Sequence, residues 1–240
     1  MIFALECKKI KRTGVFPAFI TGGLLAAAVP VVNMTVRSDI YVSLPDSPVQ
    51  ILMNANWQMM AMLNVLLLVA GACLMYHTEY ADNAILKMRM LPVKEHTLFF
   101  GKLTLIMVMG IIVMALEAAG IAICSIHWFT LPDNFSSELL KHFGYAIVLM
   151  LPAALLSLLI ASLCRNMWVS LGIGVICIFL ATMLPADSFI LSLFPFALPF
   201  QIFGNTAGEV ARNTLTACVA ETILIALMEL LLLQIRRTVE

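Results

Sequence analysis

Six stretches of this sequence are almost entirely apolar, and charged residues gather in the connections between them. The stretches lie near residues 14–34, 57–76, 103–124, 142–163, 167–184 and 214–234. About 20 consecutive apolar residues suffice for a helix to cross the hydrocarbon core of a bilayer. Backbone groups in hydrocarbon need partners within their own segment, so runs rich in Leu, Ile, Met and Ala predict helices rather than barrel strands. The sequence therefore predicts an all-α polytopic membrane protein with one transmembrane domain over residues 1–240.

Lysine and arginine are distributed unevenly between the two sides of these predicted spans. If both termini are cytoplasmic, eleven basic residues lie inside and three, Arg37, Lys141 and Arg212, lie outside. Cytoplasmic connections carry the excess of basic residues in membrane proteins, so we expect both termini in the cytoplasm. The formal net charge of +0 gives no reason to expect a nucleic-acid partner.

Motifs of enzymatic chemistry are missing from the sequence. It contains no G-x-x-x-x-G-K-[ST] phosphate loop, no H-E-x-x-H and no G-x-S-x-G. The histidines and cysteines occur singly rather than at metal-ligand spacing. We therefore expect no catalytic residue, metal site or ATP site on this chain.

The connection between the second and third predicted spans has the pattern of a short amphipathic helix. Thr78 or Asp82 can cap it, Ile85 and Met88 follow at helical spacing, and Pro92 ends it, while Arg89 lies on the polar side. Such a helix either binds another protein through its apolar stripe or lies on the lipid headgroups, and amphipathicity alone leaves both open. Residues 2–12 likewise predict either an amphipathic helix or an ordinary basic anchor.

Prolines interrupt the apolar segment 185–205, which is therefore unsuited to a continuous span. Non-helical backbone at membrane depth is tolerated where protein or a cavity surrounds it. A re-entrant or interfacial outer hairpin before the last span is the expected structure.

Three polar residues within the predicted spans are candidates for a substrate path. Glu117 and Glu221 are carboxylic acids, and Asn64 is an amide deep in the second span. An ionised carboxylate at mid-membrane costs on the order of 2.5 kcal/mol or more, so these side chains should face protein or water. They either line a path for a cationic substrate or form hydrogen bonds between helices, with the acids protonated.

Taken together, the cytoplasmic segments resemble those of a known family. Glu79 is followed by residues 83–87 of the short helix, by Leu91-Pro92-Val93 and by Gly101-Lys102 at the next span. With six spans and a basic opening, this order resembles the permease subunits of ATP-binding-cassette exporters of the ABC type 2 class. The opening at residues 5–12 is most similar to the lantibiotic-immunity and bacitracin-resistance branch.

The resemblance implies a division of labour between subunits. A separate ATPase subunit would bind ATP and Mg and hydrolyse the nucleotide, while residues 79–94 dock on it as a coupling helix. The coupling residues would be Glu79, Asp82, Ile85, Met88, Arg89 and Pro92. A second permease subunit, identical or paralogous, would complete the membrane domain in a bacterial plasma membrane, and the substrate would be a peptide antibiotic. The alternative is a membrane protein not coupled to ATP, either a secondary transporter or a scaffold or sensor.

Overall fold

The computed structural model describes residues 6–9, 11, 13–80, 95–184, 191, 193–204 and 208–239, and in these residues the regular structure is helical. Residues 6–9 form one helical turn. The other helices are α2 (Val15–Val42), α3 (Pro48–Tyr80), α5 (Glu95–Trp128), α6 (Phe135–Leu163), α7 (Met167–Met183), the 3-10 helix η2 (Leu198–Phe200) and α9 (Gly208–Val239). The all-α prediction is therefore confirmed for the described part of the chain.

Five of these helices, α2, α3, α5, α6 and α9, are long and apolar enough to cross a membrane. The fifth predicted span corresponds to α7, an apolar helix of 17 residues. At 1.5 Å per residue α7 is about 25 Å long, shorter than the hydrocarbon core. The sixth crossing therefore stays a prediction.

The helices extend beyond the ends of the predicted spans. α2 continues to Val42 through a break at Arg37, where φ is −135° and ψ is 32°. α3 begins at Pro48, nine residues before the predicted span. An apolar run locates only the part of a helix that lies in hydrocarbon, whereas backbone hydrogen bonding continues into the polar ends. Proline is also tolerated in the first turn of a helix.

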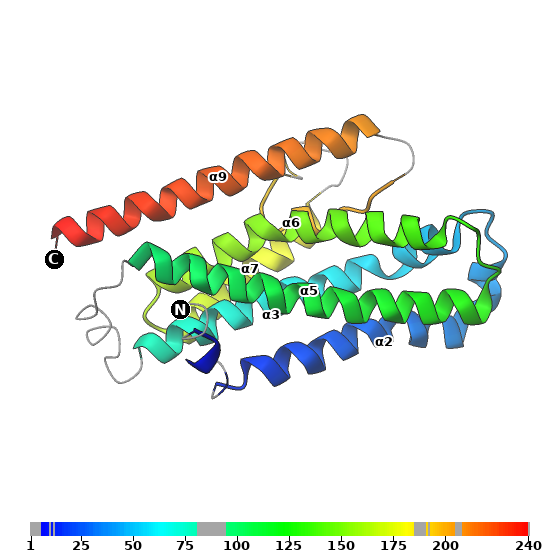
Figure 1. Cartoon of the computed structure of the whole chain (residues 1–240), viewed down its shortest axis with the longest axis horizontal. Coiled ribbons are helices and arrows are strands. Elements are labelled where there is room, and N and C mark those ends of the chain that lie inside the picture. Colours follow the sequence, from blue (N-terminus) through cyan, green and yellow to red (C-terminus); the bar gives the residue numbers. More distant parts are fainter. Residues whose placement is uncertain are drawn as a thin grey trace.

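The long helices lie side by side in an elongated bundle, with α3 near its centre (Figure 1). α3 contacts α2, α5, α6 and α7, and its Trp57, Met60 and Leu68 are fully or almost fully buried. α2 and α5 approach closely at Gly120, where a Cβ atom would lie 2.6 Å from the carbonyl oxygen of Ala27. Small residues permit such close contacts between membrane helices.

α9 lies along one side of the bundle and packs mainly on α6 (Figure 1). Apolar side chains cover its outer surface, including the exposed Ile223, Leu224, Leu227 and Leu231. The end of α9 and the beginning of α2 lie at the same end of the bundle (Figure 1). Which end faces the cytoplasm stays a prediction from the basic residues.

The described part of the predicted outer hairpin, residues 193–204, is irregular apart from η2 and packs against α3 and α6. Phe196 and Leu198 are completely buried. Trp57 Nε1 donates a hydrogen bond of 3.0 Å to the carbonyl oxygen of Pro199, which fixes this segment to α3. The segment thus has the surrounding protein that non-helical backbone needs at membrane depth.

Candidate functional site

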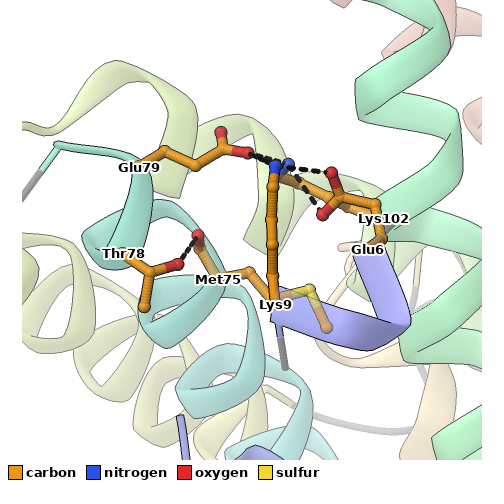
Figure 2. Close-up of polar contacts among 6 residues, drawn as sticks. All are labelled: Glu6, Lys9, Met75, Thr78, Glu79 and Lys102. Atoms are coloured by element: carbon orange, nitrogen blue, oxygen red, sulfur yellow. Dashed lines mark hydrogen bonds and ion pairs between the residues drawn. The ribbon is translucent and has the colours of Figure 1, made fainter. Parts of the chain in front are cut away.

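Four charged side chains meet where α3 ends and α5 begins (Figure 2). Lys102 Nζ lies 2.5 Å from Glu79 Oε1 and 3.2 Å from Glu6 Oε2. Lys9 Nζ lies 2.8 Å from Glu6 Oε1 and 3.0 Å from Glu79 Oε1. We call Glu6, Lys9, Glu79 and Lys102 the ion cluster. It joins the N-terminal helical turn to the last turn of α3 and the start of α5.

The ion cluster is electrically balanced and largely enclosed. Lys102 and Glu6 have side chains 1% and 2% exposed, whereas Lys9, the most open member, is 28% exposed. The ring of Tyr76 lies 5.4 Å from Lys102 Nζ and adds a cation–π contact. Breaking a buried ion pair by removing one partner is strongly destabilising, so each charge here depends on the others.

Lys9 holds its proton more tightly than an ordinary lysine. Burial lowers the pKa of Lys9, but the hydrogen bonds and charges of Glu6 and Glu79 outweigh burial and raise this pKa above the ordinary 10.5. Lys9 is therefore fully charged at neutral pH and keeps the cluster neutral.

Further contacts fix the end of α3 next to the ion cluster. Thr78 Oγ1 donates a hydrogen bond of 2.8 Å to the carbonyl oxygen of Met75 (Figure 2). The hydroxyl of Tyr80 donates to the carbonyl oxygen of Ser162 at 2.5 Å and ties α3 to the end of α6. The predicted coupling segment thus begins from an anchored helix end.

Of the predicted coupling residues, the structure places Glu79 in the ion cluster. The other five, Asp82, Ile85, Met88, Arg89 and Pro92, lie outside the described residues. Glu79 is buried, and its described ionic contacts are with Lys9 and Lys102 of the same chain. The structure thus adds an internal positioning role for Glu79 to the predicted contact with an ATPase.

A second polar contact joins α3 to α5 deep within the bundle. Asn64 Nδ2 donates a hydrogen bond of 3.0 Å to Glu117 Oε2. Asn64 is 1% exposed and Glu117 is completely buried. The structure therefore brings together two of the three predicted path residues and encloses both.

The third predicted path residue, Glu221, is partly buried on α9. Its Oε2 atom is shielded from solvent and, within the described part of the chain, has no hydrogen-bond partner. No hydrogen bond among the described residues joins Glu221 to the Asn64–Glu117 pair. Glu221 is therefore a separate polar position on the side helix.

A family model described as "ABC-2 family transporter protein" matches residues 2–181. The chain belongs to the ABC-2 transporter family. The match includes the ion cluster and the Asn64–Glu117 pair, and it ends before α9 and Glu221. No curated protein and no solved structure matches the chain.

Membership of the ABC-2 family indicates what kind of protein contains the ion cluster. It makes the chain a membrane transport subunit and implies an ATPase partner. In this ABC-2 protein, residues 81–94 connect the two helix ends that the ion cluster joins. A force applied to that connection would act directly on the ends of α3 and α5.

Proposed function

We propose that this ABC-2 protein is the permease subunit of an ATP-driven exporter, with residues 79–94 as the segment that binds the ATPase subunit. Family membership is the observation that carries the proposal. ATP and Mg would be bound by the partner, since this sequence contains no phosphate-binding motif.

The ion cluster gives the proposal a physical route from the ATPase to the membrane helices. Glu79 is the first residue of the coupling segment, and Lys102 follows the segment near the start of α5. Their contact makes the two helix ends move together, and Lys9 extends the unit to the N-terminal turn. Moving a two-state bundle from 1:99 to 99:1 requires about 5.5 kcal/mol, which ATP-driven closure of the partner would supply through this connection.

We further propose that the substrate is a cationic antimicrobial peptide of the lantibiotic type, expelled from a bacterial plasma membrane for immunity or resistance. The exposed apolar surface of α9 suits an amphipathic peptide, and Glu221 offers a carboxyl group on the same helix. Asn64 and Glu117 would join such a path only if α3 separates from α5. A second permease subunit, identical or paralogous, would enclose the path between the two copies.

The test is purification of the full chain from its own membrane in lipid nanodiscs, followed by identification of the proteins that accompany it. We expect an ATPase to accompany the chain, and we expect a lantibiotic to stimulate ATP hydrolysis. An uncharged apolar peptide of equal length serves as the control and should leave hydrolysis unchanged. A chain that purifies alone and is inert to ATP would contradict the exporter assignment. A copurifying ATPase indifferent to lantibiotic would contradict only the substrate.

A further inference from the structure

Glu117 is buried in a part of the bundle that offers it no positive charge. It is the single Asp, Glu, Lys or Arg in the apolar parts of α2, α3, α5, α6 and α7, which are residues 15–36, 48–76, 103–128, 142–163 and 167–183. An ionised carboxylate buried without a cation is strongly unfavourable. The single hydrogen bond from Asn64 does not supply the missing charge.

The Asn64–Glu117 pair leaves one oxygen atom of each residue without a hydrogen bond within the described residues. Within the described residues, neither Asn64 Oδ1 nor Glu117 Oε1 has a hydrogen-bond partner, although both atoms are shielded from solvent. Both atoms are acceptors if Glu117 is ionised, so neither can satisfy the other. A proton on Glu117 Oε1 would turn this atom into a donor. The unpaired acceptor is Asn64 Oδ1, and it belongs to the same amide that already donates to Glu117 Oε2.

We propose that Asn64 and Glu117 form a proton-binding site at the centre of the bundle, in which the protonated acid and the amide pair through two hydrogen bonds. Asn64 Nδ2 donates to Glu117 Oε2, and protonated Glu117 Oε1 donates to Asn64 Oδ1. The proton removes the charge and satisfies both unpaired atoms. α3 and α5 are then joined by a second hydrogen bond that exists only while the proton is bound.

The helices that pack against α5 support this reading because they bring acids and neutral groups rather than a permanent cation. α2 has no titratable side chain between Val15 and Val36. The lysine and arginine residues of α6 and α9, Lys141, Arg212, Arg236 and Arg237, lie within two turns of a helix end. The other titratable side chains of α3, α6 and α9 outside the terminal turns are Cys73, Tyr76, His142, Tyr145, Cys218, Glu221 and Glu229. The ring of His142 lies against Phe203 near the start of α6.

The site also links protonation to helix movement. If α3 moved away from α5, Glu117 would meet water, in which a glutamic acid is ionised at neutral pH. Separation of the helices would therefore release one proton, and rising pH would favour separation. This consequence goes beyond the proposed export function, because it holds for any movement that opens the α3–α5 contact.

The test is infrared spectroscopy of the full chain in lipid bilayers at neutral pH, comparing wild type with Glu117→Gln. We expect a carbonyl band of a protonated carboxylic acid that is lost in Glu117→Gln and shifted in Asn64→Leu. Glu221→Gln is the matched control and should retain that band. A difference spectrum with only ionised carboxylate bands would overturn the proposal, as would bands that depend on added sodium or potassium, which would indicate a metal-cation site.

The Glu117→Gln variant is expected to fold, so a missing band would not result from unfolding. Glutamine can donate to Asn64 Oδ1 and accept from Asn64 Nδ2, so Glu117→Gln should unfold at the wild-type temperature near neutral pH. As pH rises from about 5 to about 9, the wild type should lose more thermal stability than Glu117→Gln, because both proteins keep the other titratable groups and only the wild type has the Glu117 carboxyl. Equal pH dependence of the two would overturn the proposal. These measurements need neither ATPase nor substrate, so their failure is distinguishable from failure of the export function.

Discussion

Glu79 and Lys102 pair at 2.5 Å across the ends of two antiparallel helices, and the same two helices meet again deep in the bundle through Asn64 and Glu117. Fifteen residues separate Asn64 from Glu79 along α3, and the same number separates Lys102 from Glu117 along α5. At 1.5 Å per residue the two contacts are about 22 Å apart. The equal spacing keeps α3 and α5 in register, so a displacement at the ion cluster would be transmitted toward the centre of the bundle.

A double-mutant cycle on Glu79 and Lys102 should give a coupling free energy within the range of about 0.5–3 kcal/mol. Glu79→Gln or Lys102→Met alone leaves an unbalanced charge in the buried ion cluster. Together they leave the neutral Lys9–Glu6 pair, so the double variant should be less destabilised than the sum of the single variants. Thermal or denaturant unfolding in lipid nanodiscs measures the three free energies.

The matched control for this cycle combines Lys102→Met with Glu138→Gln. Glu138 is in the first turn of α6 and accepts a hydrogen bond of 2.5 Å from Ser47, at the other end of the bundle. These two substitutions should be additive. Additivity of Glu79→Gln with Lys102→Met would contradict the energetic role of the ion cluster.

Alkaline pH should release the N-terminal turn from the bundle. Because the pKa of Lys9 is raised on folding, its contribution to stability is complete below the ordinary value of 10.5 and is lost as pH rises through the higher value of the folded state. A spin label on the exposed Cys7 reports the motion of the same turn. We expect its mobility to increase above about pH 10.5 in wild type.

Two variants distinguish the effect of Lys9 on this turn from the effect of a neighbouring lysine. In Lys9→Gln the Cys7 label should be mobile already at neutral pH. In Lys11→Gln its mobility should follow wild type, because Lys11 is exposed. A Cys7 label whose motion is unaffected by Lys9→Gln would show that the ion cluster does not hold this turn.

Gly120→Ala should push α2 away from α5. The added Cβ atom would lie 2.6 Å from the backbone carbonyl oxygen of Ala27, which cannot rotate away as a side chain can. Overpacking of this kind costs about 1–3 kcal/mol. Gly144→Ala is the control, since a Cβ atom at Gly144 meets nothing within 4 Å. If both variants unfold at the same temperature, the close approach of α2 and α5 is wrong.

Trp57→Phe should loosen the irregular segment 193–204. It removes the donor to the buried carbonyl oxygen of Pro199, and an unsatisfied buried acceptor costs about 1–3 kcal/mol. Hydrogen exchange should accelerate in residues 193–204 and stay unchanged in α2. Trp168→Phe is the control because Trp168 is 72% exposed. If hydrogen exchange in residues 193–204 is unchanged in Trp57→Phe, the hydrogen bond to Pro199 does not anchor this segment.

The helices could be predicted from sequence because hydrophobic run length alone determines where a chain can lie in hydrocarbon. Every predicted span falls within a helix or its capping residue, and the errors are at the ends, as where α2 continues past Arg37. Polar residues there lower the hydropathy without ending the backbone hydrogen bonding. A pattern of apolar residues therefore locates the membrane part of a helix better than its ends.

The contacts of the site could not be predicted in the same way. The sequence identified Glu79, Asn64 and Glu117 as individual candidates, and it contained Glu6, Lys9 and Lys102 among the family-like residues. Which of them meet depends on the rotation of each helix about its axis and on the register of α3 against α5. One signal was present: Glu79 and Lys102 flank the same cytoplasmic connection with opposite charges.

We propose that the ion cluster transmits work from an ATPase subunit to the membrane helices. The most direct test is the ratio of substrate transported to ATP hydrolysed by the reconstituted complex, for wild type, Glu79→Gln and the distant control Glu138→Gln. We predict that Glu79→Gln inserts and binds the ATPase but transports less per ATP, whereas Glu138→Gln keeps the wild-type ratio. An unchanged ratio in correctly inserted Glu79→Gln would contradict the claim.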